Sequence, residues 1–284
     1  MKILLVNKYL YRKGGAETYF IKLGEYLKSL GNEVEYFGMA DERNCVGNRV
    51  EAYTENIDFH KKSLKHITYP FKIIYSVNAR KQIRKVLSDF KPDVVHLNNF
   101  NYQLTPSIIY EIKKHNIPIV YTAHDVQLVC PNHKLKNDYT GGLCRKCDGG
   151  KYFECVKNNC VHSSKIRSII GAVEAWYYKL RHTYKMIDLT VCPSEFMEKE
   201  ISRNDDINGR TVTMYNFIDE IKPLGAECEN YVLYFGRYSE EKGISNLVKA
   251  TKKLSNIPFV FAGKGELENE VNSADNIKNV GFKT

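Results

Sequence analysis

A histidine and an aspartate, His124 and Asp125, directly follow an apolar segment and are the clearest candidates for chemistry. The preceding residues, Ile117 to Ala123, are apolar and rich in β-branched side chains, which predicts a covered parallel strand. In open α/β sheets the ligand crevice lies at the carboxyl ends of the strands, where this pair falls. His124 is therefore the predicted catalytic residue; the alternative is a histidine that only holds a loop through hydrogen bonds.

Two other strand ends carry polar or glycine residues. Asn98 and Asn99 follow the strand predicted for residues 93–97, at the same edge of the sheet. Gly14-Gly15-Ala16-Glu17 lies between the first predicted strand and the first predicted helix. Glycines at a helix start let free N–H groups approach an anion or a sugar hydroxyl. The alternative is a flexible loop before a capped helix.

A basic loop, Gly236-Arg237 followed by Glu241-Lys242-Gly243, ends a strand predicted near the carboxyl end of the chain. An Arg and a Lys five residues apart in a glycine-bounded loop can both reach one diphosphate, Arg gripping two oxygens and Lys acting as a point charge. Such groups stabilise charge that develops on a leaving diphosphate. A solvated basic loop is the competing interpretation.

Four cysteines form a possible metal motif: Cys144, Cys147, Cys155 and Cys160. A two-residue gap lets two thiolates share one tetrahedral ion, and a second pair completes a closed structural zinc site. The second pair is spaced more loosely than in common zinc ribbons, so reduced thiols or an adventitious disulfide stay open as alternatives. In each case the cluster would brace a loop and perform no catalysis.

Positive charge dominates the chain, with 42 Lys+Arg against 33 Asp+Glu and a formal net charge of +9. Residues 61–91 hold Asp89 as their one acid and form a candidate contact surface. The helix predicted within residues 163–185 is both amphipathic and basic. It either lies on an anionic membrane or packs on its own sheet.

Strand-like runs alternate with helical patterns, which predicts an α/β fold of βαβ units with parallel sheets. In the first domain the strands are expected at residues 2–7, 33–38, 93–97, 117–123, 188–192 and 211–215. The second domain is expected to hold strands at 231–235, 259–262 and 279–282. The predicted first domain spans residues 1–215 with a Cys-rich insert at 126–162, the linker 216–229, and the second domain 230–284.

Several protein classes are excluded. With 43% hydrophobic and 26% charged residues, the 284-residue chain has the composition of a folded globular protein. Its first apolar run is too short for a signal peptide and no run reaches the roughly 18 apolar residues of a spanning helix, so we expect a cytoplasmic protein, peripheral at most on the inner face of the plasma membrane. Neither Gly-x-Gly-x-x-Gly after the first strand nor a Walker-type Gly-Lys-Ser/Thr is present, which argues against dinucleotide and P-loop chemistry.

Taken in order, these motifs resemble the family 4 glycosyltransferases, retaining enzymes of GT-B architecture, especially bacterial members that build cell-surface polysaccharides. The resemblance also includes three further segments: Cys130-Pro131-Asn132, Cys192-Pro193-Ser194-Glu195-Phe196 and Asn216-Phe217-Ile218-Asp219. It implies two Rossmann-like domains, with the acceptor bound mainly by the first and the nucleotide sugar mainly by the second. The expected product pathways are capsule, exopolysaccharide or O-antigen synthesis.

The resemblance also assigns roles to residues. His124 would lie beside the donor sugar, and Glu17, Asn98 and Asn99 would contact a lipid-linked or saccharide acceptor. Contacts to a UDP- or GDP-sugar donor would come from Gly14, Gly15, Gly236, Arg237, Lys242, Gly263, Gly265 and the backbone near Val280 to Phe282. On the diphosphate, the fixed positive charge would replace a catalytic metal, so no catalytic metal is expected.

One departure from the family pattern concerns two glutamates seven residues apart, which family members carry further along the second domain. The sequence ends at Thr284 before such a motif, so we expect a C-terminally truncated chain with an incomplete second domain and weak or absent turnover. Three alternatives stay open: a non-catalytic remnant, a nucleotide-sugar epimerase of similar fold, and a zinc-containing nucleic-acid-binding protein. The covered parallel strands argue against the last, and no nucleic acid partner is expected.

Overall fold

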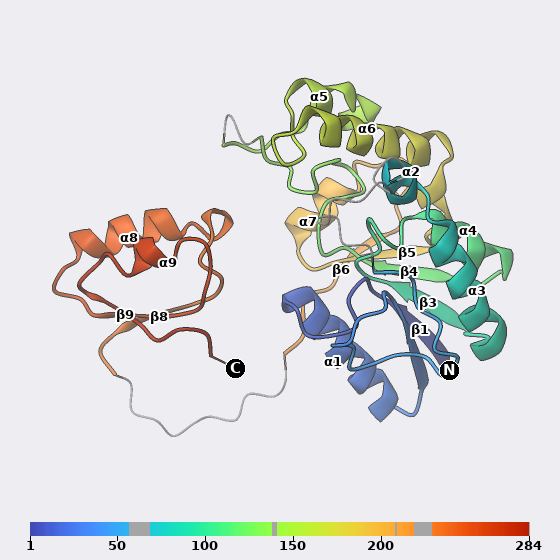
Figure 1. Ribbon diagram of the computed structural model, residues 1–284, viewed down its shortest axis with the longest axis horizontal. Coiled ribbons are helices and arrows are strands. Elements are labelled where there is room, and N and C mark those ends of the chain that lie inside the picture. Colours follow the sequence, from blue (N-terminus) through green and yellow to red (C-terminus); the bar gives the residue numbers. More distant parts are fainter. Residues whose placement is uncertain (57–68, 138–140, 208, 219–228, 284) are drawn as a thin grey trace. The chain divides into compact units, whose positions relative to one another are not determined.

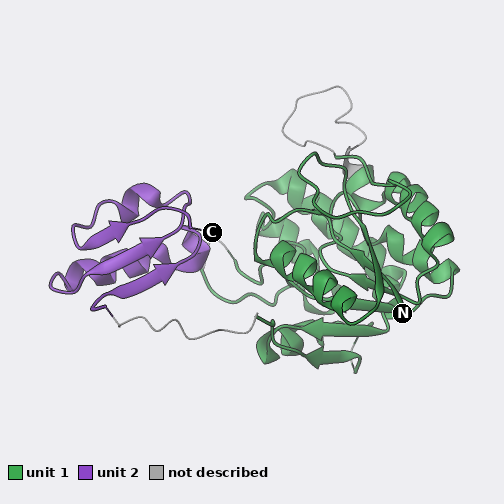
Figure 2. Cartoon of the chain, turned by 90° about the horizontal axis from the view of Figure 1, so that it is seen from below, with its two compact units in different colours: residues 1–218 green, residues 219–284 purple. Residues whose placement is uncertain are grey.

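The chain divides into two compact units, Met1–Ile218 and Asp219–Thr284 (Figure 2). The computed structural model describes residues 1–56, 69–137, 141–207, 209–218 and 229–283 (Figure 1). Most of the predicted linker, residues 219–228, lies outside the described residues. The domain limits expected at 215 and 230 stay predictions.

Unit 1 is built on a six-stranded parallel sheet in the order β2-β1-β3-β4-β5-β6 (Figure 1). Each strand lies within a segment for which the sequence pattern predicts a strand, and the observed strands are one to three residues shorter than expected. Their bounds are β1 Lys2–Val6, β2 Glu33–Phe37, β3 Val94–Leu97, β4 Ile119–Thr122, β5 Leu189–Cys192 and β6 Thr211–Thr213.

Helices cover both faces of this sheet, and each face has its own buried core. Phe20 and Ile21 of α1 pack with Leu5 on one face, whereas Ile83 of α3 and Ile109 of α4 pack on the other. Covered faces explain why the inner strands β1, β3, β4 and β5 are mainly apolar, whereas the edge strands β2 and β6 carry more polar residues. The helices of unit 1 are α1 Gly15–Ser29, α2 Tyr69–Ile74, α3 Val77–Phe90, α4 Ser107–Lys114, α5 Phe153–Lys157, α6 Lys165–Leu180 and α7 Glu195–Ile201, with 3-10 turns η2 Asp148–Gly150 and η3 Thr183–Met186.

Serine side chains start three of these helices. Ser76 accepts a hydrogen bond from the backbone N–H of Ala79 at the start of α3. Ser164 caps α6 in the same way, and Ser194 caps α7. Each cap satisfies a donor that the first helical turn leaves free, which contributes about 1 kcal/mol.

The basic segment 61–91 is only partly within the described residues, since 61–68 lie outside them. Arg80 and Arg84 of α3 pair with the buried Glu111 of α4, with N–O distances of 2.8 and 2.6 Å. The two guanidinium groups, Arg84 first, lower the pKa of Glu111 to about 2 although burial opposes this. Part of the positive charge of this segment therefore fastens α3 to α4 instead of facing a partner.

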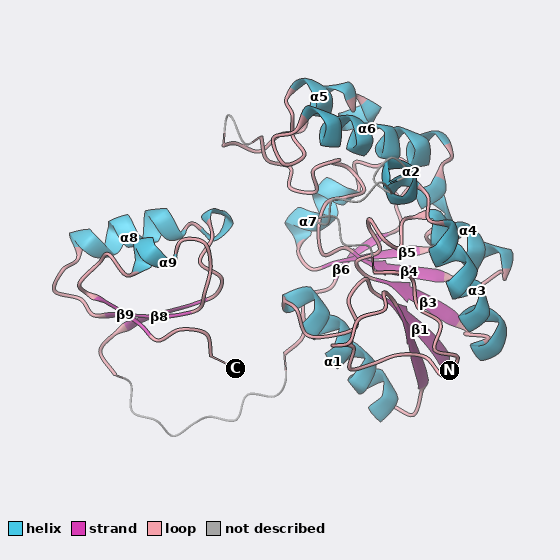
Figure 3. Ribbon diagram, viewed as in Figure 1, coloured by secondary structure: helices cyan, strands magenta, loops and turns pink. Residues whose placement is uncertain are grey.

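Unit 2 holds a three-stranded parallel sheet in the order β7-β8-β9 (Figure 3). Its strands are β7 Val232–Phe235, β8 Phe259–Ala262 and β9 Ile277–Asn279, with helices α8 Ile244–Lys253 and α9 Glu268–Val271 and the 3-10 turn η4 Glu240–Lys242. The last strand, expected at 279–282, is wrong in position. Two hydrogen bonds, from the Val280 N–H to the Phe261 carbonyl and from the Gly263 N–H to the Gly281 carbonyl, extend the contact as far as Gly281, where a left-handed φ of 69° ends the extended conformation.

Both sheets are parallel and lie among helices, so the predicted α/β class is confirmed. The carboxyl ends of β1, β3 and β4 lie side by side, because β3 pairs with both β1 and β4. This edge carries the loops in which the sequence placed Gly14, Asn98 and His124.

Candidate functional site

His124 and Asn98 meet at the carboxyl edge of the unit 1 sheet. The Nε2 atom of His124 lies 2.9 Å from Oδ1 of Asn98. Since an amide oxygen only accepts, Nε2 carries the proton and Nδ1 keeps a free lone pair. Burial lowers the pKa of His124 to about 4, so the ring is neutral at pH 7.

Asn98 is fully buried and held from both sides. Its backbone N–H donates to the carbonyl of Val6 over 2.8 Å, which fixes it at the end of β1. The Nδ2 atom of its side chain finds no hydrogen-bond partner among the described residues. A buried amide left in this way costs about 1–3 kcal/mol, so a ligand oxygen is a natural acceptor for it.

Three more side chains complete what we call the His124 cluster: Tyr19, His96 and Thr122. The Tyr19 ring packs edge-on against His124, with centroids 5.3 Å apart, and its hydroxyl is hydrogen-bonded to Thr122. Nε2 of His96 lies 2.7 Å from the Thr122 hydroxyl. Burial lowers the pKa of His96 to about 4, so both imidazoles are neutral at pH 7. The cluster thus offers neutral donors and acceptors of the kind that bind hydroxyl groups.

Charged groups lie next to this cluster. His133 places Nδ1 3.4 Å from Oδ2 of Asp125. Burial is the largest single influence and raises the pKa of Asp125, but the hydrogen bond and charge of His133, the Gln127 backbone N–H and the nearby His124 together outweigh it, so the net shift is downward. Lys8 donates to the Asn101 side chain over 3.3 Å, and burial together with the nearby Lys13 lowers its pKa to about 8.

Glu174 of α6 faces His133 from behind the site. Burial raises the pKa of Glu174 to about 7, and the nearby His133 opposes this rise. Burial raises the pKa values of Tyr102 and Tyr178, and the nearby Glu174 carboxyl raises them further. The Glu174 carboxyl, whose pKa is about 7, therefore lies near His133, which in turn contacts Asp125 beside His124.

The glycine pair and Glu17 lie at the start of α1. A Cβ atom added to Gly14 would come within 3.4 Å of Oε2 of Glu17, whereas one added to Gly15 would meet nothing within 4 Å. Gly14 is extended, with φ −164°, a conformation that any residue adopts. The fold itself therefore does not require glycine at position 15, and the space beside it is open.

Asn99 ties strand ends together through its backbone. Its N–H donates to the Asn7 side chain over 3.0 Å, and its carbonyl accepts from the Lys8 N–H over 2.7 Å. Glu17 is 7% exposed. The predicted contacts of Asn99 and Glu17 with an acceptor stay predictions.

In unit 2 the predicted donor-binding glycines gather at the carboxyl ends of β7 and β8. A Cβ on Gly263 would approach the Gly236 carbonyl to 1.9 Å, and one on Gly265 would approach the Tyr238 carbonyl to 2.1 Å. Close backbone packing therefore requires glycine at positions 263 and 265, which the sequence alone did not reveal. Their predicted contact with a nucleotide is a separate question.

Of the two cations of the basic loop, Arg237 precedes η4 and Lys242 is its last residue. Arg237 is largely exposed, with its Nη2 atom 3.8 Å from a carboxylate oxygen of Glu241. Lys242 ends η4, and its backbone N–H donates to the Ser239 carbonyl over 3.0 Å. Arg237 is thus paired only at the surface, where an ion pair contributes 0–1 kcal/mol and yields readily to a diphosphate.

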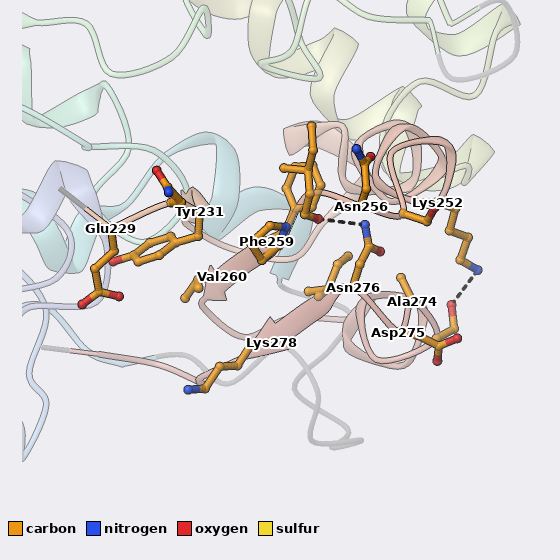
Figure 4. A pocket seen from close by; sticks show the side chains of 16 residues that line it. Glu229, Tyr231, Lys252, Asn256, Phe259, Val260, Ala274, Asp275, Asn276 and Lys278 are labelled. Atoms are coloured by element: carbon orange, nitrogen blue, oxygen red, sulfur yellow. Dashed lines mark hydrogen bonds between the residues drawn. The ribbon is translucent and has the colours of Figure 1, made fainter.

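Unit 2 has a hollow whose lining, shown in Figure 4, includes none of these residues. It is lined by Tyr231, Phe259 and Ile277, which precede or begin the three strands. The Asn276 side chain fills its floor by donating to the carbonyls of Thr251, Leu254 and Ile257. Because ligands of parallel α/β sheets bind at the carboxyl ends of the strands, this hollow at the amino ends is a poor candidate for a donor site.

The predicted cysteine cluster surrounds one small cavity of about 10 Å³. All four predicted ligands line it, and the structure adds Cys130 as a fifth: the lining thiols are Cys130, Cys144, Cys147, Cys155 and Cys160. Within the described part of the chain, no group of three or more His, Cys, Asp or Glu side chains is arranged to hold a metal ion as it stands. Structural zinc stays a prediction.

Residues 13–221 match Glycosyltransferase Family 4. The chain belongs to this family. A 42.6 kDa protein in the cps region of Klebsiella pneumoniae is 25% identical over 280 residues, which cover 93% of this chain and 68% of that protein. This relative supports the polysaccharide-biosynthesis type of the family.

Solved structures share the fold of this family 4 chain. HepE from Anabaena, in complex with UDP, is 16% identical with a TM-score of 0.60; the match covers 100% of this chain and 70% of HepE. Sucrose-phosphate synthase from Thermosynechococcus elongatus is 15% identical with a TM-score of 0.61, covering 99% of this chain and 70% of the synthase. The fold is therefore of the GT-B type.

Sequence reasoning missed several residues of the site in this family 4 chain. Tyr19, His96 and Glu174 come from three different elements and meet His124 or its neighbours only in the folded chain. Only Tyr19 could have been found from the sequence, since it lies in the first turns of the helix that begins at the glycine pair.

Across the described ranges, no helix is both long and apolar enough to cross a membrane.

Proposed function

We propose that this protein transfers a sugar from a UDP- or GDP-sugar to a saccharide or lipid-linked acceptor, with retention of configuration, in the synthesis of a cell-surface polysaccharide. Membership of Glycosyltransferase Family 4 supports sugar transfer, and the relative from a cps region supports the polysaccharide acceptor. HepE, which shares the fold, was solved with UDP, which supports a nucleotide-sugar donor.

The observation that carries the proposal is the neutral His124 cluster with its unpaired Asn98 amide. A nucleotide sugar presents hydroxyl groups that both donate and accept hydrogen bonds. Nδ1 of His124 has a free lone pair for a hydroxyl proton, and Nδ2 of Asn98 has protons for a hydroxyl oxygen. These groups fit a donor sugar without an added charge or metal.

The open space at Gly15 is the proposed place of the donor diphosphate or of the acceptor. Free N–H groups at the start of α1 favour an anion, and the missing side chain lets it come close. In unit 2, Arg237 and Lys242 are the proposed contacts of the diphosphate, with Gly236, Gly263 and Gly265 beside the nucleotide.

In the proposed reaction the bond between the anomeric carbon and the diphosphate oxygen breaks, and a bond to the acceptor oxygen forms on the same face. The acceptor hydroxyl proton passes to the departing diphosphate oxygen. Arg237 and Lys242 stabilise the negative charge that grows on this leaving group, which is the electrostatic term on which such transfers depend. His124 orients the sugar and stays neutral throughout.

We place the protein on the cytoplasmic side of the cell, peripheral at the inner face of the plasma membrane. The support for this position is the basic, amphipathic helix predicted from the sequence, which corresponds to α6.

The test is acceptor-dependent release of nucleotide from a panel of UDP- and GDP-sugars, with lipid-linked and free saccharide acceptors. His124→Ala is expected to lower the rate at least 100-fold through loss of sugar positioning. His115→Ala is the matched control, since His115 is exposed at the carboxyl end of α4 and precedes the amino end of β4, whereas His124 follows its carboxyl end. Equal rates in the two variants would refute the role of His124, and donor breakdown without any acceptor would favour an epimerase or hydrolase.

A further inference from the structure

The outward face of α6 carries a continuous apolar stripe: Ile166, Ile169, Val173, Trp176 and Leu180. The spacing of three and four residues aligns these side chains along one side of the helix. Ile166 is 72% exposed and Leu180 80% exposed, so no described residue covers the two ends of the stripe. The alternative that this helix simply packs its apolar side on the sheet does not hold for this stripe.

Helix α5 lies beside α6 and extends the apolar surface (Figure 1). Phe153 of α5 is 52% exposed and borders a groove of about 650 Å³ whose other wall is formed by Ile169, Val173 and Trp176. The Trp176 indole N–H donates to the Gly150 carbonyl over 2.9 Å, which fixes the ring at the edge of the groove. An exposed, fixed Trp next to an exposed Phe is typical of a surface that meets the polar and apolar boundary of a bilayer.

Positive charge surrounds this apolar surface. Residues 151–185 contain only two acids, Glu154 and Glu174, and the Glu174 carboxyl is turned into the protein. The basic side chains of the same segment are Lys151, Lys157, Lys165, Arg167, Lys179, Arg181 and Lys185. Lys157, Lys165 and Arg167 are exposed and make no ion pair with any described residue.

The opposite side of α6 faces the candidate site. Glu174 points toward His133, which in turn lies next to Asp125 after β4. One helix therefore presents an apolar stripe outward and a wall of the site inward.

We propose that the α5–α6 face is the docking surface for an anionic phospholipid bilayer. The apolar stripe enters the boundary between headgroups and acyl chains, and the surrounding Lys and Arg side chains contact lipid phosphates. Charge complementarity selects this occupant, because a second copy of the chain would bring two positively charged faces together. This inference rests on the membrane position proposed above and names the surface responsible; it concerns lipid binding and not sugar transfer, so either can fail alone.

The test is sedimentation of the purified protein with vesicles of phosphatidylcholine alone or with 30% phosphatidylglycerol. We expect binding to the anionic vesicles at least 10-fold tighter than to the neutral ones, and weakened when salt is raised from 50 to 300 mM, because ions screen the attraction. Leu180→Asp is expected to weaken binding at least 10-fold. Lys165→Glu combined with Arg167→Glu is expected to do the same and to reduce the salt dependence.

Leu30→Asp is the matched control. Leu30 lies at the carboxyl end of α1 and is 60% exposed. Leu180 lies at the carboxyl end of α6 and is also largely exposed. Its change is expected to leave vesicle binding within twofold, and thermal unfolding of all variants confirms that they fold. Equal binding to both vesicles, no binding to either, or a dimer in light scattering that Leu180→Asp dissociates would overturn the proposal.

Discussion

Single residues decide what the site can bind, and Gly15 is the sharpest case. A side chain at this position meets no atom of the fold, yet it would occupy the proposed place of a ligand. Gly15→Ala is therefore expected to leave thermal stability unchanged or raise it by up to about 1 kcal/mol, because Ala favours helix. The same variant is expected to raise the donor or acceptor KM at least 10-fold. A fully active Gly15→Ala enzyme would show that no ligand binds beside Gly15.

Glu174 gives a pH-dependent stability that can be isolated. Its pKa is about 7 in the folded chain, raised by burial, whereas an unfolded Glu has a pKa of about 4.3. Between about pH 4.3 and pH 7 the unfolded chain loses this proton while the folded chain keeps it. The free energy of unfolding therefore falls as the pH rises to about 7 and is constant above that pH. Gln does not ionise, so the free energy of unfolding of Glu174→Gln is expected to rise by about 1–3 kcal/mol relative to the parent protein between pH 4 and pH 8.

The measurement for Glu174→Gln is denaturant unfolding of both proteins across this pH range. The difference between the two curves removes the opposite contribution of His96 and His124, whose lowered pKa values make the protein less stable as pH falls from about 6.5 to about 4. His133, Tyr102, Tyr178 and Tyr184 also face the Glu174 carboxyl. A pH-independent difference would show that Glu174 titrates normally.

The sequence predicted His124 and Asn98 because each ends an apolar run, a local signal that survives without the fold. It did not predict that their side chains bond to each other, since 26 residues separate them. His96 was missed for a similar reason. Its position inside a strand looks structural, and only the pairing of β3 with β4 brings its ring to Thr122.

At the level of strands and loops, the glycines of unit 2 show that a glycine in the sequence can be required by backbone packing as well as by ligand binding. The sequence assigned Gly263 to nucleotide binding, and the structure adds a close crossing with the Gly236 backbone. Gly263→Ala must push two backbone segments apart and is expected to destabilise the protein by about 2–4 kcal/mol. Gly142→Ala is the control, since an added Cβ there meets nothing within 4 Å. Equal melting temperatures would contradict this tight crossing.

The cysteine cavity is the second test at this scale. Five thiols around a space for one small ion favour the predicted zinc, although their side chains must turn to ligate it. Elemental analysis of protein purified without chelator is expected to give one zinc per chain, and Cys147→Ser to lose it. Cys45→Ser is the control, because Cys45 lies outside the cavity. Less than 0.1 zinc per chain, with no thiolate band on adding Co²⁺, would leave the cluster as reduced thiols.

Strands and helices were predictable where their patterns are local. The apolar runs located every strand of the six-stranded sheet, and helical spacing located α1 and α6. The ninth strand was misplaced because its end depends on the left-handed conformation of Gly281. The direction of the α6 stripe was also unpredictable, since burial of one helix face depends on which neighbours cover it.

The whole molecule combines two parallel α/β units, and family membership followed from motifs in series, not from any single one. The sequence could not show which polar groups the fold leaves unpaired. That information, the Asn98 amide above all, is what turns a family assignment into a proposed sugar-binding site.

The most direct test of the central claim is the proton NMR spectrum of the product formed from an α-linked nucleotide sugar and a saccharide acceptor. With a donor of gluco or galacto configuration, we expect a new glycosidic bond whose anomeric proton has the small coupling constant of an α-linked sugar, since configuration is retained. A β-linked product would contradict retention. Free sugar alone, with the acceptor unchanged, would contradict sugar transfer itself.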